Sequence, residues 1–239
     1  FMIDSKEFWE SKILNWENGR YNSETGESKF NLLEWFADRS SASLRFRIKI
    51  AGEILKNVVQ GKHVFDLGCG SGLLAPVLLD EAGAASYVGI DISQNAIDAA
   101  SKLHHEFIQE GRASFHCGSV SDLAPQSANI VFSLGLLDWL TDDEMESIFA
   151  WAPEAQHFHA IAERRMIITR FIHKAYCYVA YGYRTEGYVP RYYVPSEILR
   201  LMEVLTHADR YIYRNSQLSF GAFVSTFDFD GASKLWLNS

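Results

Sequence analysis

The chain contains little proline, little cysteine and no long apolar run. Its 239 residues include 5 prolines and 3 cysteines. No stretch reaches the roughly 18 consecutive apolar residues that a membrane-spanning helix requires. The cysteines are odd in number and widely spaced, at Cys69, Cys117 and Cys177, which indicates neither a disulfide framework nor a zinc site. We therefore expect no membrane association and a reducing, cytoplasmic location.

Positive charge is also scarce. The chain has 22 lysines and arginines against 30 aspartates and glutamates, which gives a net charge of −8. A nucleic-acid-binding protein normally gathers Lys and Arg on one face, so we expect no nucleic-acid partner. Arg45, Arg47 and Lys49 form one small basic cluster, which we interpret as a solvated or locally paired helix face. The N-terminus lacks a basic region followed by an apolar run, so no signal peptide is expected.

Apolar periodicity predicts an α/β fold in which strands and helices alternate with short loops. Such alternation indicates a doubly wound parallel sheet, here of seven strands. The last two strands lie so close in sequence that an antiparallel hairpin is favoured. Strands are expected at residues 63–67, 87–91, 113–117, 129–134, 156–162, 210–214 and 221–229. Helices are expected at residues 29–38, 43–59, 73–82, 93–109 and 195–206, and after a capping box that begins at Thr141.

The length suits one domain with a full core and is short for two. We therefore treat residues 1–239 as a single domain with three parts. Residues 1–60 form a helical N-terminal cap, and residues 61–163 form the half that binds a nucleotide-like ligand. Residues 164–239 hold a lid over a substrate and the C-terminal hairpin.

A glycine loop, Gly68-Cys69-Gly70-Ser71-Gly72, follows the first predicted strand. Glycine allows a tight turn and lets a ligand approach the backbone, and the next helix presents free N–H groups. A dinucleotide fold requires Gly-x-Gly-x-x-Gly, but Leu73 occupies the third small-residue position. A triphosphate loop would need Gly-Lys-Ser/Thr, which is absent. Asp66, just before the loop, would repel a pyrophosphate and favours a cofactor with an amino-acid end.

Asp91 ends the second predicted strand, about twenty residues beyond the first glycine. In doubly wound nucleotide folds a carboxylate at this place receives the ribose hydroxyls. An isolated Asp at a strand end is more often a helix cap. Its distance from the glycine loop favours the ribose role here.

Four successive motifs resemble those of the class I S-adenosylmethionine-dependent methyltransferases over about residues 60–145. They are Asp66-Leu67-Gly68-Cys69-Gly70-Ser71-Gly72, Val88-Gly89-Ile90-Asp91-Ile92-Ser93, Phe115-His116-Cys117-Gly118-Ser119 and Asn129-Ile130-Val131-Phe132-Ser133. The resemblance implies a seven-stranded Rossmann-like methyltransferase sheet with its last strand antiparallel. It also implies S-adenosyl-L-methionine as cofactor and S-adenosyl-L-homocysteine as product.

By this resemblance the methionine lies over Gly68 and Gly70, and the ribose lies on Asp91. Ile92 would pack on the adenine, the loop Gly118-Ser119-Val120 would border it, and Leu134-Gly135 would face the methionine. The predicted cofactor-binding residues are Asp66, Gly68, Cys69, Gly70, Gly72, Asp91, Ile92, Ser119, Val120, Leu134 and Tyr21. The family often has Asp where this chain has Ser119 and Asn129, and both substitutes can still form hydrogen bonds.

The activated methyl belongs to the cofactor, so the protein must align the acceptor and exclude water. A hydroxyl acceptor also needs a general base. The histidines considered for this role are His157, His159, His173 and His207, although a histidine chosen without a partner is more often structural. The residues retained as catalytic candidates are His173, Tyr181, Tyr193 and Arg191.

Residues 176–193 are rich in tyrosine, which suits either a substrate-pocket wall or the aromatic core of a lid. In the family, the insertion after the fifth strand often covers the substrate. The N-terminal helices commonly do likewise, so Trp16 and Tyr21 join the lid candidates. This layout resembles small-molecule methyltransferases, loosely including those that act on porphyrin carboxylates.

The sequence predicts methyl transfer to an O or N atom of a small molecule, such as a sugar, a natural-product intermediate or a cofactor intermediate. No metal is predicted, because the capping box accounts for two of the three clustered carboxylates Asp138, Asp142 and Asp143. A protein or tRNA methyltransferase and a non-catalytic S-adenosylmethionine-binding protein remain alternatives. Leu73 argues against an NAD-dependent oxidoreductase. The oligomeric state, monomer or homodimer, stays open.

Overall fold

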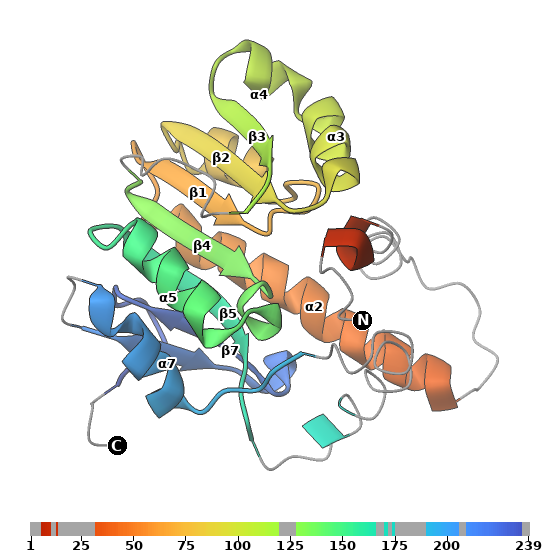
Figure 1. Ribbon diagram of the computed structural model, residues 1–239, viewed down its shortest axis with the longest axis vertical. Coiled ribbons are helices and arrows are strands. Elements are labelled where there is room, and N and C mark those ends of the chain that lie inside the picture. The colour runs from red at the N-terminus through yellow and green to blue at the C-terminus, as the bar shows by residue number, and fades with distance from the viewer. Residues whose placement is uncertain are drawn as a thin grey trace.

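The computed structural model describes residues 6–10, 13, 32–119, 128–165, 170–171, 174, 190–205 and 209–235. An eight-stranded sheet runs through these residues in the order β3-β2-β1-β4-β5-β7-β6-β8 (Figure 1). The strands are β1 (His63–Leu67), β2 (Ser86–Asp91), β3 (Ala113–Cys117), β4 (Ile130–Leu134), β5 (Gln156–Ala162), β6 (Tyr211–Arg214), β7 (Gly221–Ser225) and β8 (Ser233–Lys234). The helices are α2 (Leu32–Lys56), η1 (Val77–Glu81), α3 (Gln94–Leu103), α4 (His105–Gln109), η3 (Leu137–Trp139), α5 (Asp142–Trp151), α7 (Pro195–Leu201), η5 (Met202–Val204) and η6 (Ser216–Leu218).

The first five strands are parallel, and the chain changes direction across the sheet between β1 and β4. From β1 it proceeds outward through β2 to β3, and it then returns to place β4 and β5 on the other side of β1. Parallel doubly wound sheets bind ligands outside the carboxyl ends of the strands at such a switch point. The glycine loop after β1 lies at this point.

Two apolar layers cover the sheet, as expected for buried parallel strands. Neighbouring residues of one strand point to opposite layers, so Val131 packs in one layer while Ile130 and Phe132 pack in the other. Residues of α5 and α7 fill the first layer, and residues of α2 and η1 fill the second. The sheet is therefore held rigidly between helices, and its carboxyl edge is a fixed platform.

The predicted strands are confirmed, and β3 and β5 have the expected bounds. The antiparallel hairpin is also confirmed, because β6 pairs antiparallel with β7. The predicted count of seven strands is wrong, since β8 adds an eighth strand beside β6. This edge strand has only two residues and produces no periodic signal. β7 ends at Ser225, four residues before the expected end, where the Ser225 hydroxyl bonds to the Phe227 backbone.

Three helix predictions need correction. The two expected helices at residues 29–38 and 43–59 are one helix, α2, because the serines between them oppose a helix only weakly and no Gly or Pro interrupts it. The helix after the glycine loop, η1, spans Val77–Glu81 rather than residues 73–82, because turns continue from the loop through Leu74. The helix expected at residues 93–109 is broken at His104 into α3 and α4.

Among the described residues, no helix combines the length and the apolar character needed to cross a bilayer.

Candidate ligand site at the carboxyl edge of the sheet

The glycine loop has a backbone conformation that other residues rarely adopt. Gly68, Gly70 and Gly72 have φ angles of 69°, 53° and 72°, in the left-handed region that carries no steric cost for glycine. The Gly68 and Cys69 N–H groups both donate to the Ile90 carbonyl at the end of β2, at 2.8 and 3.0 Å. The loop is therefore fixed to the neighbouring strand.

Close packing beneath the loop also requires glycine. A Cβ on Gly72 would lie 2.8 Å from Phe115, and one on Gly68 would lie 3.2 Å from Leu136. The Cys69 side chain is buried, and its Sγ would lie 2.8 Å from a Cβ on Gly89. The Cys69 side chain is thus packed inside the protein, and only the backbone of Cys69 remains for contact with a ligand.

Asp91 lies at the carboxyl end of β2, where its side chain connects two turns. Oδ2 accepts from the Gly70 N–H and Oδ1 accepts from the Ser93 N–H, each at 2.9 Å. Burial raises the pKa of Asp91, while these two N–H groups lower it and Glu10 raises it further. A carboxylate has about four lone-pair sites, so Asp91 keeps acceptor capacity for two ligand hydroxyls.

Asp66 is buried in β1, one residue before the last of the strand. The Tyr87 hydroxyl donates to its Oδ2 at 2.5 Å. This bond ties β1 to β2 directly below the glycine loop. The role of Asp66 toward an amino-acid end of the ligand stays a prediction.

The N-terminal segment, defined as residues 6–10, is helical and contacts elements that follow two different strands. At one side the Glu10 Oε1 atom accepts from the Asn95 N–H of α3 at 3.1 Å, and the Glu10 carbonyl accepts from the Asn95 side-chain amide at 3.2 Å. At the other side the Trp9 ring packs edge-on against Trp139 of η3, with centroids 4.9 Å apart. Figure 1 shows this segment, in red, beside α3.

Arg47 on α2 reaches the same edge, which the sequence reasoning missed. Both terminal nitrogens of its guanidinium lie 3.1 Å from the position of a Cβ on Gly135, just after β4. Its Nε is buried and has no hydrogen-bond partner in the part of the chain that the structure describes. The interpretation as a solvated or locally paired face is incomplete for Arg47, which is half-buried. The helical spacing could have indicated that Arg47 faces the protein. Ala51 and Leu55 lie four and eight residues after Arg47 on the same helix face, and both are fully buried.

Asp138 of η3 is a second carboxyl group that the sequence reasoning assigned no ligand role. Its Oδ1 accepts from the Ala162 N–H at the end of β5, at 2.7 Å, and its carbonyl accepts from the Arg191 N–H. Burial raises the pKa of Asp138 to about 7, although the Ala162 N–H and the Arg47 charge both lower it. Asp138 thus lies between the carboxyl ends of β4 and β5.

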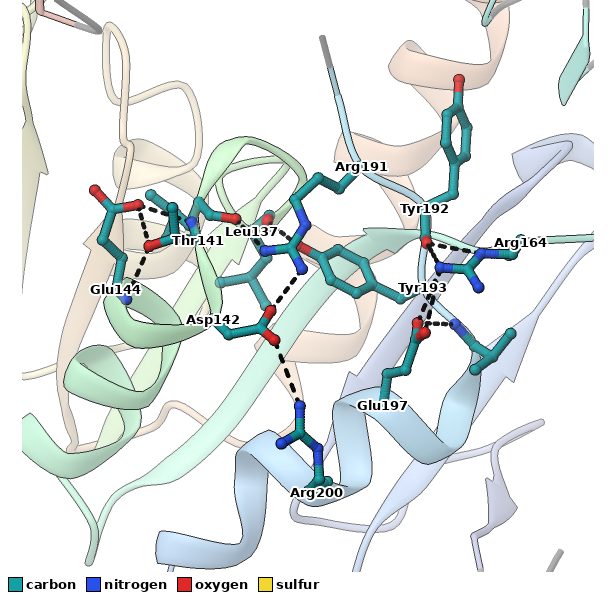
Figure 2. A network of polar contacts seen from close by, with 12 residues as sticks. Leu137, Thr141, Asp142, Glu144, Arg164, Arg191, Tyr192, Tyr193, Glu197 and Arg200 are labelled. Carbon is teal, nitrogen blue, oxygen red and sulfur yellow. Dashed lines mark hydrogen bonds and ion pairs between the residues drawn. The ribbon is translucent and has the colours of Figure 1, made fainter. Parts of the chain in front are cut away.

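Two catalytic candidates, Arg191 and Tyr193, fasten their own segment to the loop after β4 (Figure 2). The Arg191 guanidinium forms a 2.5 Å ion pair with Asp142 and donates to the Leu140 carbonyl. The Tyr193 hydroxyl donates to the Leu137 carbonyl at 2.7 Å. Burial also raises the pKa of Tyr193, so its hydroxyl keeps its proton. A direct role of either residue toward an acceptor stays a prediction.

The remaining predicted site residues fall into two groups. Ile92 and Leu134 are half-buried at the strand ends, and Ser119 is exposed beyond β3. Four more predicted residues lie outside the described residues: Val120, Tyr21, His173 and Tyr181.

The buried histidines of β5 lie inside the sheet rather than at its carboxyl edge. His157 Nε2 lies 2.9 Å from the Ala152 carbonyl, His157 Nδ1 lies 3.1 Å from His159 Nε2, and His159 Nδ1 lies 2.9 Å from the Ser133 hydroxyl. A carbonyl only accepts, so Nε2 of His157 carries a proton, His159 donates to His157, and Ser133 donates to His159. This chain uses both rings structurally.

The middle of the chain matches a known domain family. Residues 64–155 match the family model described as a methyltransferase domain. The ubiquinone biosynthesis O-methyltransferase of Neisseria meningitidis serogroup C is 32% identical over 87 residues, which cover 35% of this chain and 36% of that protein. A ribosomal protein methyltransferase of Cupriavidus metallidurans is 52% identical over 44 residues, which cover 18% of this chain and 14% of that protein. The chain thus spans about a third of the length, or less, of these curated relatives.

A solved structure extends the likeness over the whole fold. The magnesium protoporphyrin IX methyltransferase of Synechocystis, solved with bound S-adenosylhomocysteine, is 16% identical and superposes with a TM-score of 0.64. The match covers 92% of this chain and 96% of that protein. The comparisons confirm the resemblance to class I S-adenosylmethionine-dependent methyltransferases and their Rossmann-like fold. Residues 64–155 are therefore similar to a methyltransferase domain, and the fold is similar to that of a solved methyltransferase.

Proposed function

We propose that the chain is an S-adenosylmethionine-dependent methyltransferase that methylates an O or N atom of a small molecule. The observation that carries the proposal is the glycine loop with Asp91 fastened to it through the Gly70 N–H. The three glycines have positive φ angles and carry no side chain, so a cofactor can approach the backbone of the loop closely. Asp91 would receive the ribose hydroxyls, as the sequence predicts.

Arg47 supports a cofactor with an amino-acid end. A half-buried guanidinium whose Nε has no partner among the described residues favours an anion beside it. It lies against Gly135, which the sequence places at the methionine, so we assign it the cofactor's carboxylate. A planar guanidinium matches the geometry of a carboxylate and can bind it through two parallel hydrogen bonds.

The cofactor, when bound, supplies an activated methyl group on a sulfonium. The protein then has to hold the acceptor and keep water out. With Asp91 at the end of β2 and Arg47 beside Gly135 assigned to the cofactor, the carboxyl end of β5 is left for the acceptor. The tyrosine-rich segment after β5 remains our predicted lid, and residues 1–60 remain the predicted cap of the same single domain.

A small-molecule acceptor is supported by the acidic net charge and by the names of the relatives that act in ubiquinone and magnesium protoporphyrin chemistry. The short match to a ribosomal protein methyltransferase favours a protein acceptor as the second candidate. A cytoplasmic location stays a prediction based on the cysteine pattern.

Calorimetric titration tests the cofactor directly. We expect the protein to bind S-adenosylhomocysteine and S-adenosylmethionine and not to bind NADH. Arg47→Met should weaken S-adenosylhomocysteine about tenfold, the loss of one charge-assisted interaction. The same variant should leave 5′-methylthioadenosine unchanged, since that nucleoside has no amino-acid end.

Two results would contradict these assignments. Binding of NADH without S-adenosylhomocysteine would overturn the proposed function. An equal loss of both ligands in Arg47→Met would show that Arg47 supports the fold rather than the cofactor's carboxylate. Lys49→Met, which changes an exposed cation two residues further along α2, is the matched control and should bind both ligands as the wild type does.

A further inference from the structure

The N-terminal segment contacts two elements that follow different strands at the carboxyl edge of the sheet. One of its ends is fastened to Asn95 of α3, which follows β2, and its aromatic residues contact Trp139, which follows β4. In the sheet β1 lies between β2 and β4. Because the glycine loop follows β1, the segment contacts the elements on both sides of that loop.

Glu10 has an acceptor that the described part of the chain does not satisfy. Its Oε1 accepts from the Asn95 N–H, whereas its Oε2 is buried and has no hydrogen-bond partner there. Buried polar atoms are nearly always paired, so an unsatisfied one calls for a missing partner. Because a carboxylate oxygen only accepts, that partner has to be a donor.

The negative charge around Glu10 indicates which kind of donor can bind its Oε2 atom. Glu10 lies close enough to Asp91 for its charge to act on that carboxyl group, so two carboxylates face one space. The donors to these two carboxylates include the backbone N–H groups of Gly70, Ser93 and Asn95. Two nearby carboxylates repel each other, and hydrogen-bond donors placed between them reduce this repulsion. A vicinal diol offers two donors and no charge.

We propose that Glu10 is a second acceptor for the ribose of the cofactor, so that Asp91 and Glu10 share its two hydroxyls. The inference rests on the proposed function and adds a residue to it. It makes the N-terminal segment part of the binding site: the ribose holds Glu10, Glu10 holds the segment, and the segment covers the cofactor. Glu10 is thereby a residue that distinguishes a ribose from a deoxyribose.

Affinity for S-adenosylhomocysteine provides the first measurement. Glu10→Ala should weaken binding about tenfold, the range for one lost hydrogen bond to a charged group, and Glu10→Gln should weaken it less because its amide oxygen still accepts. Glu7→Ala is the matched control, since Glu7 is an exposed carboxylate on the same segment. It should bind as the wild type does.

Deoxynucleosides separate a ribose contact from a merely structural role. In the wild type, 2′-deoxyadenosine or 3′-deoxyadenosine should bind more weakly than adenosine. In Glu10→Ala one of these two penalties should shrink severalfold. Trp9→Ala, which removes a contact with Trp139 and leaves Glu10, should weaken all three nucleosides equally.

The outcomes distinguish failure of the inference from failure of the proposed function. If the wild type binds S-adenosylhomocysteine and both deoxy penalties are unchanged in Glu10→Ala, Glu10 only fastens the segment to Asn95 and the inference is overturned. If the wild type does not bind S-adenosylhomocysteine at all, the proposed function itself fails.

Discussion

Polar side chains form different contacts at two places on the carboxyl edge of the sheet. The first end comprises the carboxyl ends of β1 and β2, and the second end comprises those of β4 and β5. At the first end, the side chains Asp91 and Glu10 accept from backbone N–H groups and keep acceptor capacity. At the second end, Arg191 pairs with Asp142, and the Tyr193 hydroxyl donates to a backbone carbonyl. The carboxylates of the first end keep acceptor capacity for hydroxyl donors, whereas Arg191 and Tyr193 at the second end hold their own loops together.

The difference shows that position at the carboxyl edge does not by itself make a residue a ligand-binding one. A side chain is available to a ligand when its remaining hydrogen-bonding capacity points into free space. Arg47 and Glu10 meet this condition in the described part of the chain, while Arg191 does not. Four experiments test this contrast, and the first two concern the buried carboxyl group of each end.

The largest effect is expected from Asp138→Asn at the β4–β5 end. The pKa of Asp138 is raised to about 7, so the folded protein holds a proton that the unfolded chain releases from about pH 4 upward. The stability from this proton is complete below the unfolded pKa and is lost as the pH rises through about 7. Asn stays neutral and its oxygen still accepts from the Ala162 N–H. At pH 8 the variant should therefore be more stable, on the order of 2–4 kcal/mol.

Urea unfolding of both proteins at pH 4.5, 6 and 8 measures this effect. The stability difference between variant and wild type should grow across the series. Asp230→Asn, which changes an exposed carboxylate, is the control and should show little difference at any pH. A constant difference for Asp138→Asn would mean that Asp138 is ionised throughout and stabilised by Arg47, which would make the two ends electrostatically alike.

The next effect concerns Asp91→Ala at the β2 end. Removal of the carboxylate takes the ribose acceptors away and leaves the Gly70 and Ser93 N–H groups without their partner. S-adenosylhomocysteine affinity should fall by roughly 1–3 kcal/mol, the usual cost of unsatisfied buried partners. Calorimetry checks the loss, and Asp91→Asn should lose less because an amide oxygen can keep one N–H group. Unchanged affinity in Asp91→Ala would show that the ribose lies elsewhere.

The same contrast explains how much the sequence could predict. The glycine loop and Asp91 were predicted because their requirement is local: positive φ angles at Gly68, Gly70 and Gly72 demand glycine wherever this loop occurs. Strands β1 to β5 were predicted for a similar reason, since each is a short apolar run between turn signals.

The polar network of the β4–β5 end could not be predicted, because its partners are remote in sequence. Arg191 finds Asp142 across 49 positions, and no local pattern encodes such a pairing. Glu10 is even further from Asn95, at 85 positions. Arg47 was misread for a different reason: it was grouped with Arg45 by charge, although helical spacing places the two on different sides of α2.

A third experiment concerns the buried histidines of β5, which lie in the sheet beneath the second end. Burial, with His157 beside it, lowers the pKa of His159 well below its usual value. The unfolded chain therefore takes up a proton below about pH 6.5 that the folded protein refuses, so stability is complete above that pH and is lost as the pH falls. This dependence is opposite in sign to that of Asp138.

His159→Gln removes the titrating ring and should flatten the acid side of the stability profile. The variant should be less stable than the wild type at pH 7.5, because the hydrogen-bond chain from Ser133 to the Ala152 carbonyl is broken. Its further loss between pH 7 and pH 5 should be smaller by about 1–2 kcal/mol. Urea unfolding at these pH values provides the measurement, with the exposed His105→Gln as control. Parallel profiles for the variant and the wild type would place the acid sensitivity elsewhere.

The smallest effect is expected from Arg191→Met. This variant tests whether Arg191 only stabilises the loops at the β4–β5 end or also contacts the acceptor. The Arg191 side chain is 41% exposed, and exposed ion pairs contribute about 0–1 kcal/mol. Its backbone N–H still donates to the Asp138 carbonyl in the variant. We therefore expect a stability loss below about 1 kcal/mol and unchanged S-adenosylhomocysteine affinity. Arg200→Met, which removes the other arginine on Asp142, should behave alike. If methyl transfer to the acceptor falls in Arg191→Met and not in Arg200→Met, at equal stability, Arg191 contacts the acceptor, and the second end binds a ligand as the first does.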